Sequence, residues 1–166
     1  HKGSFWAKAS WAGHVDWISV NLEQNVPGTA GRIFAWLDQN HADFILLHAG
    51  TNDLNNTTAN NIEDILDEID RWEKSANGNP VTVVLARIID RVPNTQKVDR
   101  LNNAVEAMAN ARTNDSIIVV DQQRGAGINY TIGADMSDWL HPNARGYRKM
   151  SNVWFNGIAP LLDKCP

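Results

Sequence analysis

The order of its predicted elements places this chain in the α/β class, as a three-layer α/β/α domain built on a parallel sheet. Three short apolar runs rich in β-branched residues indicate buried strands at residues 42–49, 81–89 and 116–120. Helical patterns lie between these runs, and strands that alternate with helices are typical of a parallel sheet covered on both faces. The chain has 166 residues and shows no repeat or linker, so we expect residues 1–166 to form a single domain.

Apolar residues at spacings of three and four predict the helices. The first is expected to end near Asn25, where Pro27-Gly28 would break it, and Thr29 would cap a shorter second helix. The next two helices cover residues 62–72 and 98–108, and the last covers 147–161, ending before Pro166. Acidic residues on the 62–75 segment are expected to form a solvated face. The apolar positions that predict the helices are Trp11, Val15, Ile18, Leu22, Ile33, Phe34, Leu37, Ile62, Ile65, Leu66, Ile69, Trp72, Val98, Leu101, Val105, Met108, Tyr147, Met150, Val153, Trp154, Ile158 and Leu161.

Composition excludes several classes of protein. The chain is 43% apolar and 20% charged, which suits a packed core. The formal net charge is -4 and basic residues are spread along the chain, so neither a nucleic-acid partner nor a polybasic membrane patch is expected. No apolar run approaches the roughly 20 residues that span a bilayer. His1, His14 and His41 lack metal-ligand spacing, and neither a metal nor another cofactor is predicted.

The sequence does not indicate the cellular compartment. The single cysteine, Cys165, cannot form an internal disulfide, although a partner could lie upstream of His1. Glycosylation sequons weakly favour secretion, but chance explains them equally well in a chain rich in asparagine. The sequons begin at Asn55, Asn56, Asn114 and Asn129.

An Asp138-x-x-His141 pattern follows the third predicted strand and precedes the last helix. In a tight turn the carboxylate can accept from one ring nitrogen of the imidazole, which fixes the tautomer and leaves the other nitrogen as a base. A surface contact or a helix cap would explain so short a pattern as well. The Asp138–His141 segment indicates a functional site only when a second polar segment is expected at the same edge of the sheet.

That second segment is Gly50-Thr51-Asn52-Asp53, where the first predicted strand ends. Glycine lets the backbone approach a ligand, and the Asn52 amide could donate to a developing oxyanion. Taken alone, these residues also suit an ordinary turn. In a parallel sheet, ligand sites lie beyond the carboxyl ends of the strands, and both segments are expected there.

Together the two segments resemble the SGNH (GDSL-like) hydrolase superfamily. The residues that carry the resemblance are LLHAGTND, IIVVDQ with its following glycine-containing loop, and DWLHPNARGYRKM, which look most like the acetylxylan-esterase-like, carbohydrate esterase members. The resemblance implies a flavodoxin-like SGNH fold and a catalytic triad. It implies that His141 is the general base and acid, that Asp138 orients it, and that Asn52 is an oxyanion donor.

The family's Gly-Asp-Ser motif, which holds the nucleophile, does not occur in this sequence. Ser4 follows Gly3, but Lys2 stands before them and no strand is predicted there. We therefore expect the first strand and the nucleophilic serine upstream of His1. The second oxyanion glycine is either Gly3 or Gly13, and the sequence does not decide between them.

The resemblance implies a serine esterase acting on short-chain esters, such as O-acetyl groups on xylan or another carbohydrate. Small esters or acetylated polysaccharides are the expected partners, and Trp139, between Asp138 and His141, is a candidate substrate-binding residue. His48 is expected to be a hydrogen-bonded core residue. Three alternatives remain: a non-catalytic carbohydrate-binding relative, a lipid-directed esterase of the same superfamily, and a nucleotide-binding domain. The last is weakest, because no glycine-rich phosphate loop follows a strand.

Overall fold

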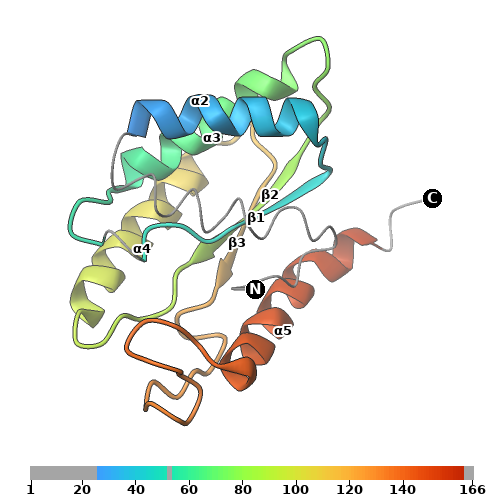
Figure 1. The fold of residues 1–166 in the computed structure, drawn as a ribbon. Coiled ribbons are helices and arrows are strands. Elements are labelled where there is room, and N and C mark those ends of the chain that lie inside the picture. The colour runs from blue at the N-terminus through green and yellow to red at the C-terminus, as the bar shows by residue number, and fades with distance from the viewer. Residues whose placement is uncertain (1–25, 52–53, 163–166) are drawn as a thin grey trace.

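The computed structural model describes residues 26–51 and 54–162 of the chain. The helix predicted upstream of Asn25 lies outside these residues. Helices and strands follow one another in the predicted order, and the fold is α/β (Figure 1). The elements are α2 (Val26–Gln39), β1 (Phe44–Leu47), α3 (Ala59–Glu73), β2 (Thr82–Arg87), α4 (Thr95–Ala111), β3 (Ile117–Asp121) and α5 (Ala144–Leu162).

The three strands form a parallel sheet in the order β1-β2-β3. Leu47 at the end of β1 is in register with Leu85 of β2, and Arg87 at the end of β2 is in register with Asp121 of β3. The carboxyl ends of the strands therefore meet along one edge of the sheet. The loops that carry the Gly50 and Asp138 segments both leave from that edge, as the parallel arrangement predicts.

Helices cover both faces of the sheet, which gives three layers. Figure 1 shows α2, α3 and α4 on one side and α5 on the other. Alternate side chains of β2 point to opposite faces of the sheet. Val83 and Leu85 belong to the core beneath α2, α3 and α4, whereas Val84 and Ala86 pack with Trp154 of α5. Because β2 is covered on both faces, its sequence is a continuous apolar run.

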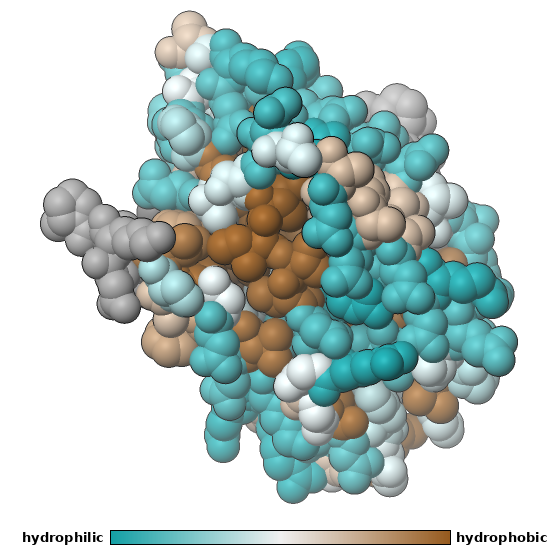
Figure 2. Space-filling view, turned by 180° about the vertical axis from the view of Figure 1, so that it is seen from behind, coloured by the Kyte–Doolittle hydropathy of each residue, from teal (hydrophilic) through white to brown (hydrophobic). Residues whose placement is uncertain are grey.

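Close packing of α5 against the sheet depends on Gly157. A Cβ atom at this position would lie 2.7 Å from Cγ1 of Val120. Not all of the apolar surface on β3 is covered, because Ile117, Ile118 and Val119 are only partly buried. Figure 2 shows an apolar area ringed by hydrophilic residues on the side of the molecule that faces away from the viewer in Figure 1.

One expectation about a helix boundary was wrong. Helix α2 begins at Val26, so Pro27-Gly28 lies in its first turn and Thr29 does not cap it. Proline is tolerated in a first turn because its missing N–H would have no partner there.

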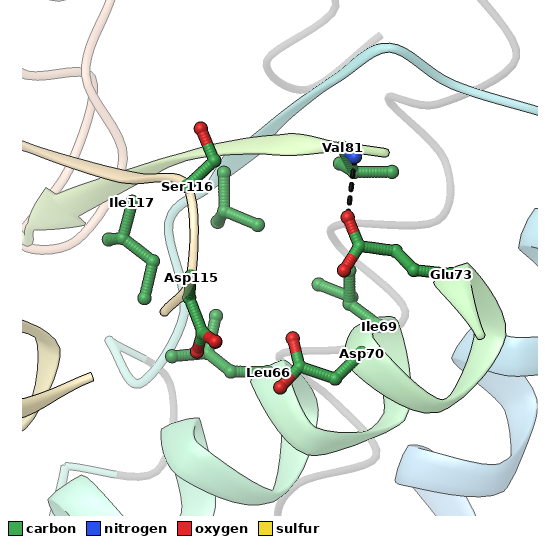
Figure 3. Close-up of a pocket in the computed structure, with 9 residues that line it drawn as sticks. Leu66, Ile69, Asp70, Glu73, Val81, Asp115, Ser116 and Ile117 are labelled. Atoms are coloured by element: carbon green, nitrogen blue, oxygen red, sulfur yellow. Dashed lines mark hydrogen bonds between the residues drawn. The ribbon is translucent and has the colours of Figure 1, made fainter. Parts of the chain in front are cut away.

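The acidic side of α3 is also more than a solvated face. Arg112, just after α4, reaches across to Asp67 at 2.6 Å and Asp70 at 2.9 Å, and it also pairs with Asp115 and Glu63. Figure 3 shows Asp70 of α3 facing Asp115, which precedes β3, in a small pocket at the amino end of the sheet. The Arg112 guanidinium neutralises carboxylates from both segments and ties them together.

Candidate active site

Asp138 and His141 form a hydrogen-bonded pair in the loop between β3 and α5. Nδ1 of His141 lies 2.8 Å from Oδ2 and 3.0 Å from Oδ1 of Asp138. Oδ1 of Asp138 also accepts the backbone N–H groups of Leu140 and His141, each at 2.8 Å. One carboxylate therefore shapes the turn and holds the imidazole.

These contacts determine the charge of Asp138 and the tautomer of His141. The backbone N–H of Leu140, and after it the His141 side chain, lower the pKa of Asp138 to about 2. An ionised carboxylate can only accept, so the neutral imidazole must carry its proton on Nδ1, and Nε2 keeps its lone pair. The His141 and Asp138 side chains are 42% and 52% exposed, so the pair is open to solvent.

The turn that carries the pair is closed at its base. The N–H of Ser137 donates to the carbonyl of His141 at 2.7 Å. Met136 forms bridges with Ile132 and Pro142, and it is 1% exposed. Its side chain belongs to an apolar cluster beneath the loop that includes Met150 of α5. The backbone on both sides of Asp138 and His141 is therefore packed against the rest of the molecule.

A buried carboxylate, Asp135, ties this loop to α5. Its side chain is 3% exposed and accepts from Nζ of Lys149 at 2.6 Å and Nε of Arg145 at 2.8 Å. The N–H of Asn129 donates to it at 2.7 Å. Lys149, followed by Asn129, lowers the pKa of Asp135 to about 2, so the carboxylate is ionised and fully partnered.

Asn143 joins the end of the loop to the start of α5. Its Oδ1 accepts the N–H groups of Arg145 at 2.9 Å and Gly146 at 3.2 Å, while its Nδ2 donates to the carbonyl of Ala134 at 2.8 Å. The asparagine thus satisfies two N–H groups at the helix start that have no partner within the helix.

The segment after β1 is held from two sides. Gly50 has φ 108°, and a Cβ atom there would lie 3.0 Å from Cγ2 of Thr57 and 3.1 Å from Cδ2 of Leu101. Glycine therefore suits both the conformation and the space. The carbonyl of Thr51 accepts from Nη1 of Arg91 at 3.2 Å. Asn52, the predicted oxyanion donor, follows directly and lies outside the described residues.

Residues just after β2 connect these two segments. The hydroxyl of Tyr130, in the loop after β3, accepts the N–H of Asp90 at 2.9 Å. The next residue is Arg91, which binds Thr51. The loop after β2 thus contacts both segments. Arg91 binds Thr51, the residue before Asn52, and Asp90 binds Tyr130 in the loop that carries His141.

A buried polar network supports this junction. Asn102 of α4 pairs with both backbone groups of Ile88, at 2.8 Å and 2.9 Å, and donates to Gln123 at 2.9 Å. Gln123 in turn donates to Asp90 at 2.7 Å and Asp99 at 2.8 Å. Burial raises the pKa of Asp90, while the hydrogen bond from Gln123 opposes that rise.

His48 has the hydrogen-bonded position that its place in an apolar strand predicts. Its Nε2 accepts the N–H of Ile89 at 3.3 Å, and burial lowers its pKa to about 4. The ring is therefore neutral at physiological pH and links the ends of β1 and β2. Trp139 differs from the packed Trp72 and Trp154, because it is 71% exposed beside the Asp138–His141 pair.

The described serines and potential metal ligands lie within residues 26–51 and 54–162. None of the serine hydroxyls there is hydrogen-bonded to the imidazole ring of His141. Ser4, Gly3 and Gly13 lie outside this range, as does Cys165. The same residues contain no group of three His, Cys, Asp or Glu side chains arranged to hold a metal ion. No helix among them is long and apolar enough to cross a membrane.

The sequence did not identify Asp135, Arg91 and Tyr130 as supports of the site. One signal was available for Asp135, because Arg145 and Lys149 are four residues apart and lie on one face of α5. The partners of Arg91 and Tyr130 are 40 residues away in the chain, and no local pattern predicts such pairs.

Two named proteins are similar in sequence. A "Putative endoglucanase X" of Acetivibrio thermocellus is 25% identical over 149 residues, 87% of this chain and 62% of that protein. A "Multidomain esterase" of Ruminococcus flavefaciens is 28% identical over 128 residues, 72% of this chain and 16% of that protein. The chain thus matches less than two thirds of the length of either relative.

Solved structures share the fold. A carbohydrate esterase family 3 protein from Talaromyces cellulolyticus has a TM-score of 0.68 at 18% identity, covering 89% of this chain and 69% of that one. A family 3 carbohydrate esterase of Clostridium thermocellum has a TM-score of 0.66 at 23% identity, covering 84% and 67%. An acetyl esterase mutant, crystallised with acetate, has a TM-score of 0.67 at 19% identity, covering 88% and 68%.

A family model identifies the chain directly. The GDSL-like Lipase/Acylhydrolase model matches residues 15–154, a range that includes the Gly50 segment, the Asp138–His141 pair and all three strands. This match covers well over half of the chain and agrees with the fold and with the two sequence segments. The chain therefore belongs to the GDSL-like lipase/acylhydrolase family.

Proposed function

We propose that this chain is the greater part of a serine esterase that removes short acyl groups, such as acetyl, from carbohydrate. The observation that carries the proposal is the Asp138–His141 pair, in which an ionised carboxylate fixes the Nδ1 proton and leaves Nε2 with its lone pair on a half-exposed ring. Residues 1–166 would be one domain, and the nucleophilic serine and first strand would lie upstream of His1.

The proposed reaction is acyl transfer in two steps. Nε2 of His141 takes the proton of the serine hydroxyl as the serine oxygen attacks the ester carbonyl, and the charged imidazolium is stabilised by Asp138. The amide of Asn52, together with a backbone N–H from Gly3 or Gly13, donates to the oxyanion. His141 then returns the proton to the leaving alcohol, and a water molecule releases the acid by the same route.

Carbohydrate as the alcohol is supported by two observations. The relatives whose fold this chain shares are named as carbohydrate esterases, and Trp139 exposes 71% of its surface beside the pair. Indole faces pack well against the apolar faces of sugar rings. We therefore assign Trp139 to the binding of the sugar that carries the ester.

The test is the variant His141→Ala in the protein that includes the upstream region. Its kcat on p-nitrophenyl acetate and on acetylated xylan should fall by roughly 10³-fold or more, because the general base is lost. Circular dichroism and the unfolding temperature should change little, since the ring is partly exposed. Trp139→Ala should raise KM for acetylated xylan while leaving p-nitrophenyl acetate turnover nearly unchanged. Full activity of His141→Ala would contradict the proposal.

A further inference from the structure

A groove of about 330 Å³ lies beside the segment that follows β1. One wall is formed by residues 54–59, which lead into α3, and the other by the first turns of α4. Leu54, Leu101 and Ala104 give it an apolar floor. Nothing in the proposed acyl-transfer reaction uses this groove.

The groove adjoins Gly50, in the segment that follows β1. Thr57 and Leu101 line it, and a Cβ atom at Gly50 would lie 3.0 Å and 3.1 Å from these same two side chains. Gly50 is two residues before Asn52. A sugar polymer bound with its ester near the oxyanion donor would therefore extend over or past this groove.

Two cations give the groove its charge. Lys97 and Arg100 are three residues apart on one face of α4, and both are exposed. Nζ of Lys97 donates to Oδ1 of Asn55 at 2.6 Å, a neutral partner that leaves the charge uncompensated. Arg100 makes no hydrogen bond or ion pair within the described part of the chain. No acidic side chain is found among the described residues of the groove wall.

Cations near the amino end of α4 destabilise the helix, so their presence there suggests a role in binding. Lys97 lies in the first turn of α4, and that turn contains no acidic residue. The amino end of a helix is electropositive, so cations there are repelled and anions are attracted. Two cations in the first turns of α4 that pair with no described carboxylate, in a chain of net charge -4, favour positive potential in the groove.

We propose that this groove binds the carboxylate of a uronic acid branch on the polysaccharide, with Arg100 and Lys97 as its ligands. The apolar floor suits the face of a pyranose ring, and the guanidinium of Arg100 can bind a carboxylate with two parallel hydrogen bonds. The inference rests on the proposed function in one respect: the ester that is cleaved would lie on the same polymer, near His141.

The test compares two acetylated xylo-oligosaccharides that differ only in one glucuronic acid branch. The complete protein should have the higher kcat/KM on the branched substrate, and raising NaCl from about 0.05 M to about 0.5 M should reduce that preference. The double variant Lys97→Gln/Arg100→Gln should lower the preference by roughly tenfold. Arg148→Gln, which removes an exposed cation from α5, is the matched control and should leave it unchanged.

Two further measurements separate the groove from the esterase reaction. Turnover of p-nitrophenyl acetate, which is too small to reach the groove, should be equal in the wild type and the double variant. If the wild type does not hydrolyse it, the esterase proposal fails, and calorimetric binding of the branched oligosaccharide still tests the groove. Equal preference for the branch in the double variant and the control would overturn the inference. A changed acyl-chain preference in the double variant would also overturn it, because the groove would then bind the acyl group.

Discussion

The Asp138 carboxylate accepts hydrogen bonds from the backbone N–H groups of Leu140 and His141 and from the His141 ring, all within one turn. These donors keep it charged to about pH 2, so it stays ionised wherever a neutral His141 could act as a base. At the scale of single residues, the charge of Asp138 and the orientation of His141 are consequences of the same few hydrogen bonds.

Asp138→Asn should therefore abolish most of the activity while preserving the fold. An amide of the same size can no longer stabilise the imidazolium, and its NH₂ group can face Nδ1 and favour the wrong tautomer. We expect kcat on p-nitrophenyl acetate to fall roughly 10³- to 10⁴-fold, as for the corresponding change in other triads. Asp64→Asn, on the exposed side of α3, is the control. Retention of a tenth of the activity by Asp138→Asn would argue against its role.

At the scale of elements, the loop after β3 is attached to α5 through the buried Asp135. The pKa of this group is about 2 in the folded chain and about 4 in an unfolded one. Its contribution to stability is therefore complete above pH 5 and is lost as the pH falls from about 4 through 2.

Asp135→Asn should lower stability most at neutral pH, because it leaves Lys149 and Arg145 without their anion. Urea unfolding of wild type and variant at a series of pH values measures this effect. The difference between their free energies of unfolding should shrink as the pH is lowered toward 2.5. A difference that is constant with pH would mean that the charge of Asp135 contributes nothing.

Arg112 attaches α3 to the residues before β3 at the opposite end of the sheet. Arg112→Met should destabilise the fold by about 2 kcal/mol, because Asp70 and Asp115 would then face each other without a cation. Burial and the Asp115 charge already raise the pKa of Asp70. Arg124→Gln, which removes an exposed pair with Asp99, should cost less than about 0.5 kcal/mol. Equal unfolding midpoints for the two variants would contradict this prediction.

At the scale of the whole molecule, the three layers meet closely at Gly157, where α5 touches Val120 of β3. Gly157→Ala would place a methyl group 2.7 Å from Cγ1 of Val120, and the helix must move or the valine must rotate. We expect a loss of about 1–3 kcal/mol in the free energy of unfolding, despite alanine's higher helix propensity. Asn156→Ala, on the exposed side of α5, should be neutral or stabilising. A more stable Gly157→Ala would show that α5 can move without cost.

Sequence patterns predicted the strands, the order of the elements and the segments after β1 and β3. They succeeded because alternation and apolar spacing are local consequences of burial on the two faces of the sheet. They failed where partners are distant in the chain: Arg112 meets Asp67 across 45 residues, and no periodicity reveals that pair. The role of Asp135 in holding the His141 loop to α5 was missed although Arg145 and Lys149 lie only 10 and 14 residues away. The spacing of the two cations does not reveal that the loop folds back onto them.

Trp139 also gives the molecule an optical property. Among the described tryptophans, Trp72 and Trp154 are sealed in the core, and Trp36 is partly buried, whereas Trp139 has most of its indole in water. An indole in water emits at longer wavelength than a buried one, and small quenchers reach it first. Among these four tryptophans, Trp139, two residues from His141, would therefore emit furthest to the red and be quenched first, which makes it a local reporter of what approaches the site.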